Sequence, residues 1–195
     1  MKTRENNLSG QESMRIITEM ISRTKATIRQ GSFHLLFWGW LIVFCSLAEF
    51  FLYRFSAWEH PYYIWFLTIP GVFVSLIYGF TKGRKSRFRT YADRLYMWTW
   101  MAFLFTAITL FVLLSGKMQN VIPFILMLAG LPTFLSGIIV RFRPLITGGV
   151  IFWVMAIVSN YTGIMFEPLI MALAVISGYL IPGYLIKRKA EHEEL

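Results

Sequence analysis

Residues 32–55 read SFHLLFWGWLIVFCSLAEFFLYRF, and this stretch decides the fold. It contains one glutamate, one histidine and one arginine close to its end. An α-helix rises about 1.5 Å per residue, so a helix of this length can cross a hydrocarbon core about 30 Å thick. Lipid, rather than water, is therefore the expected surrounding of the chain.

The composition agrees with this interpretation. Of the 195 residues, 56% are hydrophobic and only 15% are charged, whereas about a quarter of an ordinary soluble domain is charged. We expect an all-α, polytopic membrane protein. The single cysteine, Cys45, excludes an intramolecular disulfide. The net charge of +9 does not indicate nucleic-acid binding, because no soluble basic fold accompanies it.

Five further apolar segments follow the first. Six transmembrane helices are expected over residues 32–55, 62–80, 95–115, 121–140, 145–161 and 164–186. They make a transmembrane domain over 32–187, followed by a tail over 188–195. Every lysine and arginine except Arg54 and Lys117 precedes the first span or follows an even one. The positive-inside rule then predicts a multi-pass protein of the cell (inner) membrane with cytoplasmic N- and C-termini.

Residues 1–31 are expected to form a cytoplasmic amphipathic helix. Ser9 and Glu12 match a capping box, and apolar residues recur at steps of three and four from Met14 onward. Gly31 is predicted to end this helix before the first span begins. The helix over residues 9–30 is expected to lie on the lipid surface, with binding of a cytoplasmic protein partner as the alternative.

A weak internal repeat favours three parallel helical hairpins. Trp38 and Trp40 in the first span resemble Trp98 and Trp100 in the third, and Trp153 lies in the fifth. Prolines fall in the even spans, at Pro70, Pro123, Pro132, Pro168 and Pro182. Because proline removes a backbone hydrogen bond that lipid cannot replace, these bent helices are expected to face protein or a wet cavity.

Small residues at helical spacing predict packing faces. Gly71, Ser75 and Gly79 recur at steps of four in the second span. The third span carries a weakly polar stripe, namely Thr99, Ala102, Thr106 and Thr109. Such seams suit packing within the chain, and they equally permit a homo-oligomer.

Two acids within apolar spans are the strongest candidates for a binding site. Glu49 and Glu167 both fall toward the extracytoplasmic side, and an ionised acid in hydrocarbon normally faces a cavity, finds a partner or takes up a proton. The candidate ligand- or ion-binding residues are Glu49, Glu167, Arg54, His60, Asn160 and Tyr161. The alternative is that both acids reach the nearby interface or pair with Arg54 or His60 for structure.

The basic loop after the second span is a candidate contact for anionic lipid head groups. Its relevant residues are Lys82, Arg84, Lys85, Arg87 and Arg89. No cofactor and no metal site are expected, since no Cys/His/carboxylate cluster has zinc spacing. No enzymatic activity is expected either, because no histidine lies near the intramembrane serines to activate them.

Six spans with internal termini resemble the substrate-binding subunits of energy-coupling vitamin importers. Three two-helix units are likewise similar to mitochondrial carriers, although the Pro-x-acid-x-x-base signature of that family is missing here. These resemblances cover topology alone and imply no residue roles. The leading hypothesis is a small membrane protein that binds or transports a small solute or ion at Glu49 and Glu167. The second is a membrane adaptor or sensor that acts through its N-terminal helix.

Overall fold

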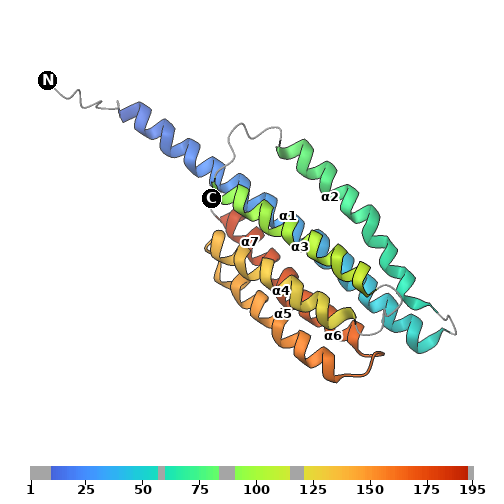
Figure 1. Cartoon of the computed structure of the whole chain (residues 1–195). Helices are drawn as coiled ribbons and strands as arrows, with labels where there is room; N and C mark the ends of the chain where they lie inside the picture. Colours follow the sequence, from blue (N-terminus) through green and yellow to red (C-terminus); the bar gives the residue numbers. More distant parts are fainter. Residues whose placement is uncertain (1–9, 57–59, 84–90, 115–120, 193–195) are drawn as a thin grey trace.

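The computed structural model describes residues 10–56, 60–83, 91–114 and 121–192, and every regular element in these ranges is helical (Figure 1). The elements are α1 (Gly10–Phe55), the 3₁₀ helix η1 (Pro61–Leu67), α2 (Thr68–Gly83), α3 (Tyr91–Leu113), α4 (Val121–Ile139), α5 (Arg143–Tyr161), α6 (Glu167–Val175), the π-helix η2 (Ile176–Leu180) and α7 (Ile181–His192). Six helical segments are long and apolar enough to cross a membrane: Ser32–Phe55, Pro61–Tyr78, Arg94–Leu113, Val121–Ile139, Arg143–Tyr161 and Glu167–Arg188. The all-α expectation is confirmed.

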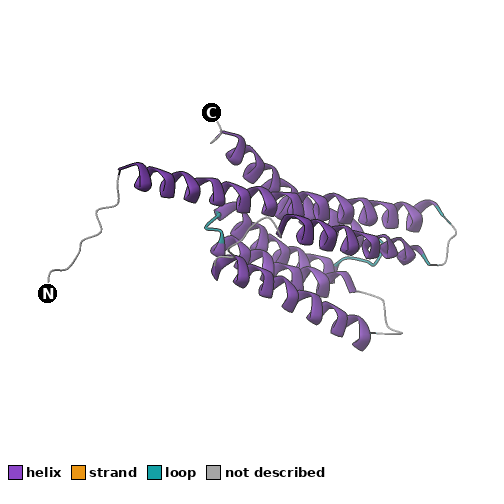
Figure 2. Cartoon of the chain, turned by 90° about the horizontal axis from the view of Figure 1, so that it is seen from above, coloured by secondary structure: helices purple, strands orange, loops and turns teal. Residues whose placement is uncertain are grey.

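α1 is a single helix of 46 residues, and it differs from the prediction at Gly31. The expected stop at Gly31 is wrong, because the helix continues through this residue into the apolar segment. A glycine inside a helix costs about 1 kcal/mol relative to alanine, whereas a break would leave several backbone groups without partners. In both views the N-terminal part of α1 continues past the bundle along the same axis (Figures 1 and 2).

The last span occupies the centre of the bundle. It is built from α6, η2 and α7, and it packs against α1 on one side and α5 on the other. Its buried side chains include Met171, Val175 and Tyr179, and Phe152 of α5 meets the Tyr179 ring edge-on at 4.9 Å. A central span therefore organises the core, whereas η1, α2 and α3 lie at the periphery.

The prolines of the even spans mostly face protein, as predicted. Pro132, Pro168 and Pro182 are fully buried, and Pro123 is buried as well. Pro182 follows the π-helix, in which the Ile181 N–H bonds to Ile176 O, because a widened turn accommodates a ring that would clash in a regular helix. Pro70 differs, since it is exposed near the start of α2.

α4 and α5 make the most extensive helix–helix contact. In the turn between these two helices, Arg141 adopts a left-handed backbone conformation with φ 55°. The Phe142 N–H donates a 2.8 Å hydrogen bond to Gly137 O and so caps the end of α4. At Gly149 an added methyl group would lie 2.7 Å from the Phe134 backbone nitrogen. Only glycine permits this approach. The most extensive contact therefore joins α4 of the expected second hairpin to α5 of the expected third hairpin, rather than two helices of one hairpin.

Each of the first two hairpins contains the same kind of hydrogen bond, from a tryptophan to a serine. The Trp38 indole N–H donates to Ser75 Oγ at 2.9 Å, and the Trp100 indole N–H donates to Ser136 Oγ at 3.2 Å. Each bond joins an odd span to the even span that follows it. Trp153 departs from this arrangement, because its N–H donates to Met127 O on the preceding span.

The predicted stripe of α3 does not pack against other helices of this chain. Thr106 and Thr109 are exposed and donate to carbonyls one turn earlier in α3. The face that packs carries the aromatic residue Trp100, which meets Phe103 of its own helix and Tyr179 of η2. Threonine hydroxyls satisfied within the helix provide little reason to pack, whereas a tryptophan adds a large apolar area and an N–H donor.

Basic side chains gather at one end of the bundle. Leu36 of α1 lies against Gly183 of α7, and Phe33 stacks on Tyr78 of α2, so the start of the first span meets the ends of the second and sixth. The described lysines and arginines at this end are Arg94, Arg141, Arg143, Lys187 and Arg188. Arg54 lies at the opposite end of α1.

Candidate functional site

Glu49 is a buried acid on the inner face of α1. Only 5% of its surface is exposed, and its Oε2 accepts a 2.9 Å hydrogen bond from the Trp65 indole N–H. Trp65 lies on η1, the 3₁₀ segment that begins the second span. The α1–η1 hairpin therefore supplies both the carboxyl group and its donor.

Glu167 is the first residue of α6, and 3% of its surface is exposed. Phe166 caps the helix, and Pro168 follows at a position where its missing N–H has no intrahelical role. A carboxyl group at this position faces the free N–H groups and positive end of the helix dipole, which favours negative charge there. The start of the central span thus provides a favourable location for this buried acid.

The two acids lie on parts of α1 and α6 that contact each other. The rings of Phe50 and Phe166, the residues adjacent to Glu49 and Glu167, have centroids 6.4 Å apart, and the charge of Glu49 bears on the Glu167 carboxyl group. No described lysine, arginine or histidine acts on either carboxyl group. Two buried like charges without a cation are costly, so a proton or a bound cation is needed to offset them.

Two buried hydroxyl groups lie on the helices that flank this pair. Ser46 precedes Glu49 by one turn on α1, and Ser159 lies in the last turn of α5. Both side chains are fully buried, and neither hydroxyl oxygen has a hydrogen-bond partner among the described residues. Cys45, the neighbour of Ser46 on α1, is buried as well, and its thiol is directed at Ile64 O at 3.8 Å. This end of the bundle therefore concentrates polar groups in the interior.

Among the residues predicted for the site, the structure brings together only the two acids. Arg54 is exposed and lies over the Phe55 ring at 5.6 Å, and His60 is exposed and bonded to the Tyr62 hydroxyl at 3.1 Å. Asn160 and Tyr161 are exposed at the end of α5. The two carboxyl groups are buried. The alternative in which both acids extend to the membrane interface is therefore not observed.

The candidate lipid contacts fall mainly outside the described residues. Arg84, Lys85, Arg87 and Arg89 lie in the range 84–90, and Lys82 belongs to the last turn of α2. Within the described part of the chain, no group of three His, Cys, Asp or Glu side chains is placed to hold a metal ion.

Sequence reasoning missed Trp65 and Tyr53. Glu49 lies six residues before the end of α1, and Trp65 lies four residues after the start of η1. At rises of 1.5 Å and 2.0 Å per residue these distances are about 9 Å and 8 Å, so the two residues lie at a similar level in antiparallel spans. This similar level is the signal that identifies the donor. Tyr53 follows Glu49 by four residues on the same helix, a spacing that brings side chains together.

No known protein family, curated protein or solved structure significantly matches this chain. Only the residues themselves therefore indicate a function. Their arrangement offers two adjacent carboxyl groups, one indole donor and a surrounding apolar bundle, which together can hold a small positive charge.

Proposed function

We propose that this chain is a multi-pass membrane protein whose Glu49–Glu167 pair reversibly binds a proton or a small cation near the extracytoplasmic side. The observation that carries the proposal is the burial of two interacting carboxyl groups with no described cationic side chain acting on them. A positive charge offsets their repulsion and the cost of removing them from water. Both termini are cytoplasmic in this proposal, because the basic residues gather at the opposite end.

The size of the ligand follows from the packing around the acids. Both carboxyl groups are almost completely enclosed, and the apolar groove of this bundle follows the other half of α1, from Phe33 to Phe44. A proton or a dehydrated monovalent cation fits such surroundings more readily than a larger solute. The same enclosure of both acids favours a binding role without catalysis.

The test is ligand-dependent thermal stability of the purified protein in detergent. Melting is measured over a range of pH values and, at fixed ionic strength, in lithium, sodium, potassium or choline chloride. Wild-type protein should respond to pH or to one small cation, by about 2.7 kcal/mol at a ligand concentration of 100 times Kd. The Glu49→Gln/Glu167→Gln variant should lose this response.

The matched control is Glu191→Gln, an acid-to-amide change beyond the last span. It should respond as the wild type does. A double variant that retains the full wild-type response would overturn the proposed site. Proteoliposomes loaded with a pH-sensitive dye then distinguish transport from binding alone.

A second candidate function is supported by the continuity of α1. The helix extends about 30 Å beyond the first span, at 1.5 Å per residue, and this extension could contact a cytoplasmic protein partner. Deletion of residues 1–30 followed by a pull-down tests this adaptor role. An unchanged set of captured proteins would count against it.

A further inference from the structure

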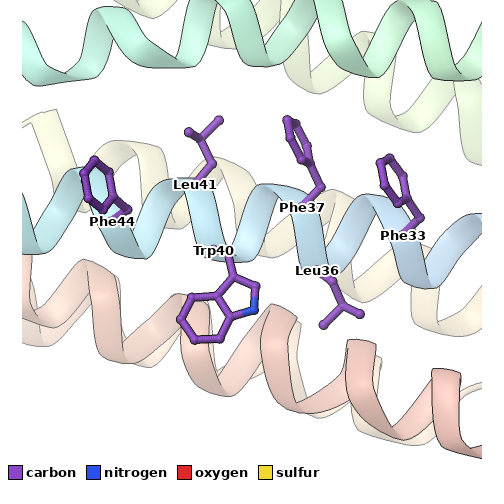
Figure 3. A pocket seen from close by; sticks show the side chains of 6 residues that line it. All are labelled: Phe33, Leu36, Phe37, Trp40, Leu41 and Phe44. Atoms are coloured by element: carbon purple, nitrogen blue, oxygen red, sulfur yellow. The ribbon is translucent and has the colours of Figure 1, made fainter.

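We infer that the apolar groove along α1 is a binding site for one acyl chain of an anionic phospholipid, whose head group lies beside Arg188. The groove has a volume of about 490 Å³ and is lined by Phe33, Leu36, Phe37, Trp40, Leu41 and Phe44 (Figure 3). The inference requires insertion in a membrane but does not depend on the Glu49–Glu167 pair.

The groove has a helix on each side. Leu41 lies against α2 at Gly71, where an added methyl group would come within 2.6 Å of its Cδ2. Trp40 extends toward α7 and donates its N–H to the Tyr184 hydroxyl at 3.1 Å. Figure 3 shows the lining side chains divided between these two directions. The groove itself is lined by side chains of α1 alone, and α2 and α7 flank this helix.

The length of the groove matches one leaflet. Phe33 and Phe44 are eleven residues apart on α1, or about 16 Å at 1.5 Å per residue, and half of a hydrocarbon core is about 15 Å. Beyond Phe44 the buried face of the helix becomes polar, beginning with Cys45 and Ser46. The groove therefore covers one leaflet and ends near the middle of the membrane.

The groove begins at the basic end of the bundle. Leu36 lies against Gly183 and Gly39 against Leu180, so continuing this antiparallel register brings Arg188 close to the level of Phe33. The Arg188 side chain is exposed. A guanidinium group at the level where an apolar groove begins complements a phosphate attached to hydrocarbon.

The lining favours a flexible chain over a second helix. All six lining side chains are large and apolar, whereas helices that associate in a membrane use small residues for close approach. An acyl chain can follow the uneven surface between aromatic rings. These observations favour a lipid over a second copy of this chain.

The test uses delipidated protein in detergent and phosphatidylglycerol or phosphatidylcholine with identical brominated chains, which quench nearby tryptophans. Phosphatidylglycerol should bind more tightly than phosphatidylcholine. Arg188→Glu should weaken phosphatidylglycerol binding about tenfold, since it reverses one charge at the surface. Arg143→Glu, at the same end but on α5, should leave it unchanged.

Two tryptophan variants test where on the protein the acyl chain of the lipid binds. Trp40→Phe should remove a larger share of the quenching than Trp98→Phe, whose exposed indole lies on α3. Equal affinities for the two lipids, equal effects of the two arginine variants, or equal effects of the two tryptophan variants would overturn the inference. So would a dimer that Phe44→Ala dissociates and the matched exposed change Phe105→Ala does not, because the groove would then belong to an interface between two copies.

Discussion

The Trp65 indole N–H donates a 2.9 Å hydrogen bond to Glu49 Oε2, so the first two spans are joined at the level of the buried acids. The donor comes from η1 and the acceptor from α1. This bond satisfies one lone pair of a carboxyl group that has no described cationic partner. It also orients that carboxyl group relative to Glu167, the other member of the proposed site.

Replacement of Trp65 by phenylalanine should destabilise the protein. The change keeps an aromatic ring but leaves a buried carboxyl oxygen without its donor, at a cost of about 2 kcal/mol. Denaturant or thermal unfolding in detergent measures the effect, with Trp98→Phe on the exposed face of α3 as the control. If the two variants are equally stable, the bond contributes little.

The two acids should not behave independently. Glu49→Gln and Glu167→Gln each remove one of two interacting charges, so the second substitution should relieve less repulsion than the first. A double-mutant cycle should yield a coupling energy of about 1 kcal/mol. Glu49→Gln combined with Glu191→Gln is the control and should be additive. Additivity in both cycles would show that the carboxyl groups do not interact.

Close packing of α4 on α5 predicts contrasting effects of two glycine substitutions. Gly149→Ala introduces a methyl group 2.7 Å from the Phe134 backbone nitrogen and should cost about 2 kcal/mol of stability through overpacking. Gly163→Ala should be close to neutral, because an added Cβ there meets nothing within 4 Å. Melting temperatures of both variants check this. Similar losses at the two positions would contradict the α4–α5 interface.

The hydrogen bond that joins α3 to α4 predicts that replacing two different serines will cost different amounts of stability. Ser136→Ala removes the acceptor of the Trp100 N–H and should cost about 1 kcal/mol. Ser177→Ala should have a smaller effect, since its hydroxyl donates only to carbonyls of its own helical segment, Leu173 O and Ala174 O. Unfolding measurements on the two variants compare them directly, and a larger loss for Ser177→Ala would contradict this assignment.

Topology can be tested with single cysteines in a Cys45→Ser background. Ser86→Cys and Lys187→Cys should react with an impermeant thiol reagent from the same side of the membrane, and Arg54→Cys from the opposite side. The reason is that the positive-inside rule places basic connections in the cytoplasm. Reaction of the first two positions from opposite sides would exclude six crossings and the proposed location of the acid pair.

The sequence anticipated the helical segments because membrane thickness imposes a local criterion. About 20 apolar residues suffice to cross the hydrocarbon core, and this property is visible in a short window. The buried prolines follow from the same environment, since lipid offers no hydrogen bonds to a disrupted backbone. Pro132, Pro168 and Pro182 are accordingly enclosed by protein.

The errors arose where competing contacts decide the outcome. Gly31 has the residue type of a helix terminus, yet both flanking segments continue as one helix. The threonines of α3 have the spacing of a packing face, yet Trp100 gains more from its contacts with Ser136 and Tyr179. Neither outcome can be predicted from the sequence of one segment, because it depends on contacts with residues that are distant in the sequence.

The sequence by itself determined an all-helical chain with six apolar segments, basic residues in alternate connections and two acids within the spans. These properties depend on composition and on the 1.5 Å rise of a helix, both of which are local. Only the tertiary structure decided that Glu49 faces Trp65, that Glu167 lies beside it, and that α1 carries a groove between α2 and α7. Such relationships depend on how distant helices pack, and differences of a few kcal/mol distributed over many contacts select among the alternatives.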